Sequence, residues 1–209
     1  MRHSCALLAT LLASAPWAAE EPAVPGSAEA KAEICAACHG PLGRSVTPEW
    51  PSIAGQTEPY LRVQLELLRS TERYDATMSP MARTLNDADI RDLAKYYSEQ
   101  TLPSKSAPSR TFEMGGTIYE QGRAASGTQA CKDCHGSDGR GNTALAAPAI
   151  RAQNAVYVIK QLQAYAAGNR YRNPDETSRA SPGGAMEAVA KTLSQEDISS
   201  LAGYIESMP

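Results

Sequence analysis

The sequence predicts an all-α fold built as two tandem domains, and three observations lead to this prediction. The chain has 209 residues, which is enough for two small domains. Segments in its first half match segments in its second half in register, as in a duplicated domain. Apolar residues recur at helical spacing, and no segment shows the convincing alternation of apolar and polar residues that is typical of a strand.

The first 19 residues have the pattern of a secretory signal peptide. Arg2 and His3 form a positive start, and an apolar run of 11 residues follows at positions 5–15. This run is too short to cross a bilayer as a helix. Small residues come next, and we expect cleavage near Ala18 or Ala19. The alternatives are an uncleaved anchor and a buried helix, but the pattern favours an exported chain with at most peripheral membrane association.

Four cysteines remain beyond the signal peptide, and they form two C-x-x-C-H motifs. This motif is the attachment signature of c-type haem, in which two thiols bond the vinyl groups and the histidine ligates the iron. The sequence therefore predicts two covalently attached haem c groups. Their predicted anchors are Cys35, Cys38 and His39 in the first half and Cys131, Cys134 and His135 in the second.

Other uses of these cysteines fit the pattern less well. A four-cysteine zinc site normally places its pairs about 15–20 residues apart, whereas 92 residues separate these two pairs. Disulfides are common in exported proteins, but here each of the four cysteines beyond the signal peptide lies in a C-x-x-C pair that histidine follows. A redox dithiol would not require that histidine at both places. Haem attachment is therefore the favoured interpretation.

Two pairs of segments carry the internal repeat. PSIAGQTEPYLRVQLELL at residues 51–68 parallels PAIRAQNAVYVIKQLQAY at residues 148–165. LNDADIRDLAKYYSEQ at residues 85–100 parallels LSQEDISSLAGYIESM at residues 193–208. The repeat thus extends well beyond the haem motifs and covers whole domains.

A segment without helical periodicity separates the two halves. TLPSKSAPSR, at residues 101–110, is rich in Pro and Ser, a composition typical of a linker. We therefore expect a first domain at residues 27–102, a linker at 103–109 and a second domain at 110–209.

Each half is expected to contain a helix, the haem motif, an irregular segment, a second helix, a loop and a final helix. In residues 60–68 the spacing of Leu61, Leu65 and Leu68 predicts the second helix of the first half. Asn86 and Ser194 are predicted N-caps of the final helices, each with Asp three positions on. The predicted inward faces of these final helices are Ile90, Leu93, Ala94 and Tyr97, and Ile198, Leu201, Ala202 and Ile205.

The sixth ligand of each iron is predicted to be methionine. The chain has three histidines, of which His3 lies in the signal peptide and the other two follow the cysteine pairs, so none is left for a bis-histidine site. Met1 leaves with the signal peptide, and Met114 lies in a helix before the second haem motif. Met208 is the penultimate residue, and we expect it to fray. Met186 is then the candidate in the second half.

In the first half the choice is between Met78 and Met81, both in a predicted MSPM loop. Met78 precedes Asn86 by eight residues, and Met186 precedes Ser194 by the same eight, whereas Met81 precedes Asn86 by only five. We therefore predict Met78 and Met186 as ligands and expect Met81 to pack at the haem edge. With His and Met on each iron, both sites are closed, which favours an electron carrier over an enzyme.

The chain is similar to the dihaem cytochrome c4 family of bacterial periplasmic electron carriers. The similarity lies in CAACHG, PSIAGQ and MSPMARTLNDADIRDLAKYY, and in their counterparts CKDCHG, PAIRAQ and AMEAVAKTLSQEDISSLAGYI. It implies two cytochrome c-like domains, each wrapped around one covalent haem c, with the haems close at the domain interface. It also implies a periplasmic protein that carries electrons from a respiratory donor to a terminal oxidase.

The resemblance further implies a proline carbonyl that accepts a hydrogen bond from each ligating imidazole, and Pro51 and Pro148 match that position. Loop rigidity is the alternative role of these prolines. The interval from first cysteine to methionine is 43 residues in the first half and 55 in the second. The extra length lies at residues 168–184, either as a solvated loop or as a segment that shields the haem or docks a partner.

Charge and histidine count limit the competing functions. A formal charge of −3 argues against a nucleic-acid partner. Residues 27–102 carry a net charge of −3 and residues 110–209 a net charge of zero, which could orient the carrier between partners or reflect ordinary scatter. A haem peroxidase would need an open or His-ligated iron, and the chain lacks the histidine. A cytochrome subunit of a periplasmic dehydrogenase complex remains the alternative, and we expect a monomer.

Overall fold

The computed structural model describes residues 26–101, 112–171 and 183–209. The predicted signal peptide at residues 1–19 and the predicted linker at 103–109 lie outside these ranges, as does most of the segment at 168–184. Within the described ranges no helix is both long and apolar enough to span a bilayer.

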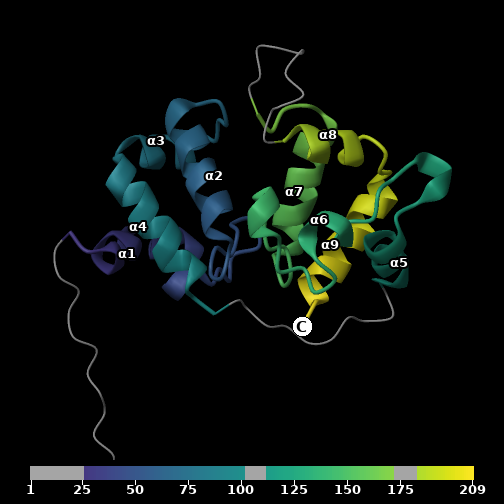
Figure 1. Ribbon diagram of the computed structural model, residues 1–209, viewed down its shortest axis with the longest axis horizontal. Helices are drawn as coiled ribbons and strands as arrows, with labels where there is room; N and C mark the ends of the chain where they lie inside the picture. Colours follow the sequence, from purple (N-terminus) through teal and green to yellow (C-terminus); the bar gives the residue numbers. More distant parts are fainter. Residues whose placement is uncertain (1–25, 102–111, 172–182) are drawn as a thin grey trace, which may run out of the picture.

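The described residues form two helical lobes that lie side by side (Figure 1). They contain no strand, only isolated bridges between Arg123 and Thr128 and between Asn142 and Ala147. The all-α prediction is therefore confirmed. The first lobe consists of α1 (Ala28–His39), α2 (Glu58–Ser70), α3 (Met78–Arg83) and α4 (Asp87–Ser98), with a 3₁₀ turn at Pro41–Gly43. The second consists of α5 (Glu113–Gln121), α6 (Lys132–His135), α7 (Ala155–Ala166), α8 (Gly184–Ala190) and α9 (Gln195–Ser207), with 3₁₀ turns at Ala124–Ser126 and Thr143–Leu145.

The final helix of each lobe begins at a capping box, as predicted. In α4 the Asn86 side chain accepts a hydrogen bond from the Asp89 amide at 3.0 Å, and the Asp89 carboxylate accepts one from the Asn86 amide. Ser194 and Asp197 repeat this exchange at the start of α9. These bonds satisfy amides that the first turn of a helix leaves without partners.

The predicted inward faces of α4 and α9 are buried and lie in the cores of the two lobes. Met208 behaves differently from the prediction. Only 3% of its surface is exposed, and it packs in the core of the second lobe instead of fraying. Tertiary packing therefore overrides the usual looseness of a chain end at this residue.

Two local differences from the predicted element order concern the haem motifs and the MSPM segment. α1 runs directly into the first motif, but α5 ends at Gln121 and the second motif has its own short helix, α6. Gly122 causes this break: its φ is 68°, and a Cβ there would lie 2.2 Å from the Thr128 carbonyl oxygen. MSPM is not a loop but the start of α3, where the Asp75 carboxylate accepts hydrogen bonds from the Thr77 and Met78 amides.

Candidate functional site

A cavity of about 420 Å³ lies between the lobes and receives lining residues from both. Its volume is in the range of small-molecule and cofactor sites. Five of the eight predicted site residues line this cavity: Cys35, His39, Met78, His135 and Met186. Residues from two distant parts of the chain therefore meet in one continuous space.

The other three predicted site residues lie close by. Cys38 lines a smaller cavity of about 290 Å³ together with His39 and Met78. Cys131 packs against the core of the second lobe, and Cys134 is half-buried directly before His135. All four thiols are free of disulfides.

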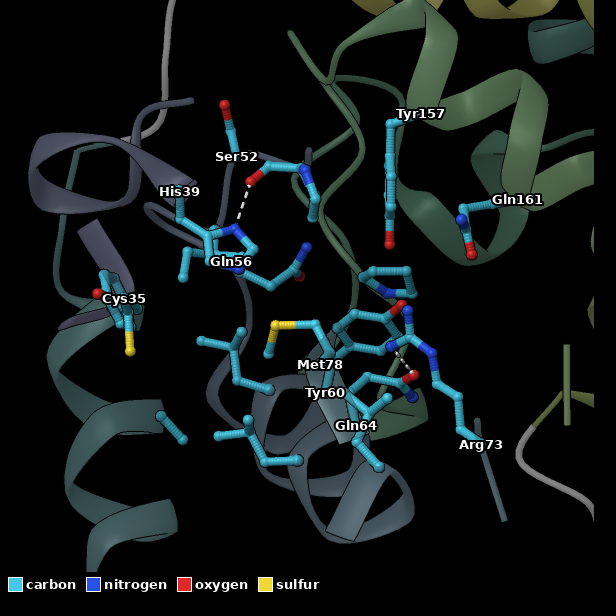
Figure 2. Close-up of a pocket in the computed structure, with 18 of the residues that line it drawn as sticks. Cys35, His39, Ser52, Gln56, Tyr60, Gln64, Arg73, Met78, Tyr157 and Gln161 are labelled. Carbon is cyan, nitrogen blue, oxygen red and sulfur yellow. Dashed lines mark hydrogen bonds between the residues drawn. The ribbon is translucent and has the colours of Figure 1, made fainter. Parts of the chain in front are cut away.

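The two histidines are held in the same way in both lobes. His39 ends α1 and His135 ends α6, and both side chains are buried. Nδ1 of His39 lies 2.8 Å from the Pro51 carbonyl oxygen, the bond drawn in Figure 2, and Nδ1 of His135 lies 2.9 Å from that of Pro148. An Nδ1 that donates to a carbonyl leaves Nε2 with its lone pair, the form that ligates a metal. The carbonyl role implied for the two prolines is thus present in the structure.

Burial sets the protonation states of these groups. It lowers the pKa of His39 and of His135, which favours the neutral, ligating imidazole. It also raises the pKa of the Cys35 thiol and raises that of Cys131 to about 11. A reactive dithiol needs a lowered thiol pKa, so these environments disfavour the redox-dithiol alternative.

The methionines enter the cavity from segments far from the cysteine pairs. Met78 lies at the first turn of α3 and is half-buried, and Figure 2 shows it pointing into the same space as His39. Met81 is 42% exposed and lines the rim of the larger cavity. Met186 lies in α8, half-buried, and contacts the core of the second lobe. The half-buried position of Met78 suits a ligand better than the exposed one of Met81.

Two arginines meet where the lobes touch, and sequence reasoning missed both. Arg170 is only 7% exposed, its Nη2 donates to the Tyr60 hydroxyl at 3.1 Å, and its Nη1 donates to Gln161. Arg73 donates from Nη1 to Gln64 Oε1 at 2.7 Å (Figure 2). The buried Arg170 differs from the solvated loop expected at residues 168–184, most of which lie outside the described residues.

This cluster of donors fits the haem that the cysteine motifs imply. Among the described residues neither guanidinium forms an ion pair, and Nε of Arg170 is buried without a hydrogen-bond partner. Burial alone would raise the pKa of Tyr157, but Arg73 and Arg170 lower it, so the potential here is positive. A guanidinium as buried as that of Arg170 is rarely found without a partner of opposite charge. A haem carries two propionate carboxylates, and the apolar cavity beside these donors would take its ring.

The internal repeat contains a pattern from which this cluster could have been predicted. Its members are pairs of the same residue type at equivalent positions of the two halves. Gln64 and Arg170 are buried and the other members are half-buried, and Arg170 of the second lobe donates to Tyr60 and Gln64 of the first. The pairs are Tyr60 and Tyr157, Gln64 and Gln161, and Arg73 and Arg170.

The chain resembles known proteins over most of its length. The Cytochrome c family model matches it twice, at residues 23–100 and 119–209. Cytochrome c4 of Azotobacter vinelandii is 34% identical over 189 residues, which cover 86% of this chain and 87% of that protein. The crystal structure of reduced recombinant cytochrome c4 from Pseudomonas stutzeri superposes with a TM-score of 0.78 at 33% identity, over 88% of this chain and 100% of that chain.

A relative with a different name matches equally broadly. It is the thiosulfate dehydrogenase electron acceptor of Thiomonas intermedia (strain K12). That protein is 32% identical over 197 residues, which cover 92% of this chain and 86% of the relative.

Proposed function

The chain belongs to the dihaem cytochrome c4 family, and on that premise we propose that it carries electrons in the periplasm from a respiratory donor to a terminal oxidase. Cytochrome c4 proteins are electron-transfer proteins, not enzymes, and this chain is a carrier with two covalent haem c groups, each with a His/Met axial pair. The observation that supports the proposal most is the shared cavity, where the ligand candidates of both lobes lie together.

We propose specific residues for the two sites. Cys35, Cys38, His39 and Met78 would hold the first haem, and Cys131, Cys134, His135 and Met186 would hold the second. The burial of both histidines, their carbonyl partners and the equal spacing of the two methionines support this assignment. We also propose domain bounds of 27–102 and 110–209, with the linker between them.

The chain's own residues prepare these sites for rapid electron exchange. A haem iron, when bound, supplies the one-electron redox chemistry. The carbonyls of Pro51 and Pro148 fix the tautomer and orientation of the two imidazoles. Arg73 and Arg170 would bind the propionates, and the apolar wall would exclude water, which favours the less charged, reduced state of the site. Two protein ligands on each iron leave no coordination position for a substrate.

A test of the donor and acceptor uses the purified holoprotein and membranes that contain a terminal oxidase. The reduced protein is mixed with the membranes, and the loss of its reduced haem absorption is followed by stopped flow. We expect the rate at which both haems pass electrons to the oxidase to be no lower than the turnover rate of the oxidase. Haems that stay reduced beside an oxidase that accepts electrons from another cytochrome would refute oxidase delivery.

The alternative is a cytochrome subunit or acceptor of a periplasmic dehydrogenase, and the name of the Thiomonas relative favours it specifically. Reduction of the oxidised holoprotein by thiosulfate and a purified thiosulfate dehydrogenase would support this function. A stoichiometric dehydrogenase recovered with the tagged chain would indicate a permanent subunit. We expect neither a stable complex nor a requirement for thiosulfate if the main proposal is right.

A further inference from the structure

Two glutamines connect the lobes in a reciprocal manner. Gln153 of the second lobe reaches the first lobe and bonds both backbone groups of Ser52. Its Oε1 accepts from the Ser52 amide at 2.9 Å, and its Nε2 donates to the Ser52 carbonyl at 2.8 Å. The side chain is only 8% exposed, so these bonds are shielded from water.

Gln56 makes the mirror-image contact from the first lobe. Its Oε1 accepts from the Ala149 amide at 2.7 Å, and its Nε2 donates to the Ala149 carbonyl at 2.8 Å. Gln56 and Gln153 occupy equivalent positions, each five residues after the proline of its own half. We refer to Gln56 and Gln153 as the crossed glutamines.

The backbone N–H groups that the crossed glutamines bind belong to the peptides beneath the imidazoles. The Ser52 N–H is part of the same peptide group as the Pro51 carbonyl, which accepts from Nδ1 of His39. The Ala149 N–H likewise shares a peptide group with the Pro148 carbonyl, the partner of His135. A peptide group is planar and conjugated, so a hydrogen bond at its N–H polarises its carbonyl.

From this geometry we propose that the crossed glutamines are positioning residues for the iron of the opposite lobe. Gln153 orients and polarises the Pro51 carbonyl, which strengthens its hydrogen bond from His39 and makes that imidazole more basic. A more basic ligand favours the oxidised iron. Gln56 would act in the same way on His135. Each lobe thus adjusts the reduction potential of the other, an inference that rests on the two haem sites proposed above.

The test is an equilibrium redox titration of the holoprotein with Gln153→Met or Gln56→Met, which remove the amide at similar length. NMR signals of the two axial methionine methyl groups distinguish the haems during the titration. Gln153→Met should raise the equilibrium constant for reduction of the haem in the first lobe about threefold, which raises its reduction potential by about 28 mV for a one-electron couple. The reduction potential of the haem in the second lobe, where Gln153 lies, should change by less than a third of that amount. Gln56→Met should give the reverse pattern.

Asn154→Ala is the matched control at the same interface. Its Nδ2 donates across the boundary to the Thr47 and Trp50 carbonyls, neither of which belongs to a peptide beneath an imidazole. We expect this variant to leave both potentials unchanged. Similar shifts in all three variants would overturn the inference, because they would report a loosened interface.

Amide hydrogen exchange gives a second readout for each variant. Exchange of the Ser52 amide should accelerate in Gln153→Met but not in Gln56→Met, and exchange of the Ala149 amide should do the opposite. A potential shift confined to the haem of the mutated lobe would refute the crossed effect. Accelerated amide exchange without any change in reduction potential would refute it as well. Failure of the oxidase experiment would instead refute the proposed function, since the titration needs no partner protein.

Discussion

At the scale of the residue, the histidines were predictable and their surroundings were not. Cys-x-x-Cys-His identifies His39 and His135 because the motif is local. Arg170 and Gln153 owe their positions to contacts with Tyr60 and Ser52, about a hundred residues away, and a single half of the repeat carries no information on such contacts. Met208 was misjudged for the same reason, because its burial depends on the packing of the second lobe.

The choice of Met78 over Met81 can be tested by substitution. Met78→Ala should abolish the weak far-red band by which the oxidised first haem reports an iron–sulfur bond, so about half of the band should remain. Met81→Ala is the control, and it should keep the full band because its side chain is largely exposed. Loss of the band in Met81→Ala with retention in Met78→Ala would reverse the assignment.

Asp75 should determine how firmly Met78 is held. Its carboxylate accepts from the Met78 amide at 2.9 Å and the Thr77 amide at 3.0 Å. Hydrogen bonds to a charged acceptor contribute about 1.5–3 kcal/mol. Asp75→Ala should therefore allow added imidazole to displace the methionine at roughly tenfold lower concentration. Asp75→Asn keeps a hydrogen-bond acceptor, so its affinity for imidazole should rise less than that of Asp75→Ala. Equal imidazole affinities in the two variants would contradict this role of Asp75.

The protonation of Asp75 gives the same contact a pH dependence. Burial disfavours the charged carboxylate, but the amide hydrogen bonds from Met78 and Thr77, together with the positive charges of Lys160 and Arg73, outweigh burial and leave its pKa below the usual 3.8. A lowered folded pKa means that the contribution is complete above pH 3.8 and is lost as the pH falls through the folded value. Displacement of the methionine by imidazole should thus be insensitive to this group near neutral pH.

At the scale of the element, local signals predicted the helices well where they were strong. The spacing of Leu61, Leu65 and Leu68 predicted a helix at 60–68, and α2 spans Glu58–Ser70. The segment MSPM was expected to be a loop because its helix has only six residues, too few to show a periodic pattern. Its start depends on Asp75, a residue outside the helix that supplies the missing hydrogen-bond acceptor.

The capping boxes should contribute measurably to stability. Asn86→Ala and Ser194→Ala each remove the side-chain acceptor at a helix start, and each should lower the free energy of unfolding by about 1 kcal/mol. Chemical denaturation of the holoprotein measures this change. Asp92→Ala, at an exposed position of α4, is the control and should change stability by less than about 0.5 kcal/mol. No loss in either cap variant would contradict the account of these helix starts.

At the scale of the whole molecule, duplication places two similar sites face to face. The sequence repeat predicted the two domains and their tandem order, but it could not predict that one cavity would join them. That depends on α2 and α7 both facing the boundary between lobes (Figure 1), where Gln64 and Tyr171 also bond across it. A shared cavity would bring the two haems close enough for electrons to pass between them.

The charge difference between the two domains predicts that the rate of encounter with a partner protein depends on ionic strength. The first domain carries a net charge of −3 and the second a net charge of zero. If encounter is steered by this field, the rate of electron exchange with the oxidase should fall as salt is raised. The measurement is the stopped-flow rate over a range of ionic strength. A rate that stays flat from low to high salt would show that the charge difference is ordinary scatter.

The central claim is that the protein contains two closed haems that accept and release electrons. The most direct test is a reductive titration of the holoprotein, followed by visible absorption, with and without carbon monoxide. We predict two reversible one-electron steps per chain that carbon monoxide leaves unchanged, because His and Met occupy both axial positions of each iron. A single step, or a spectrum and potential altered by carbon monoxide, would reveal a missing or open haem and contradict the account.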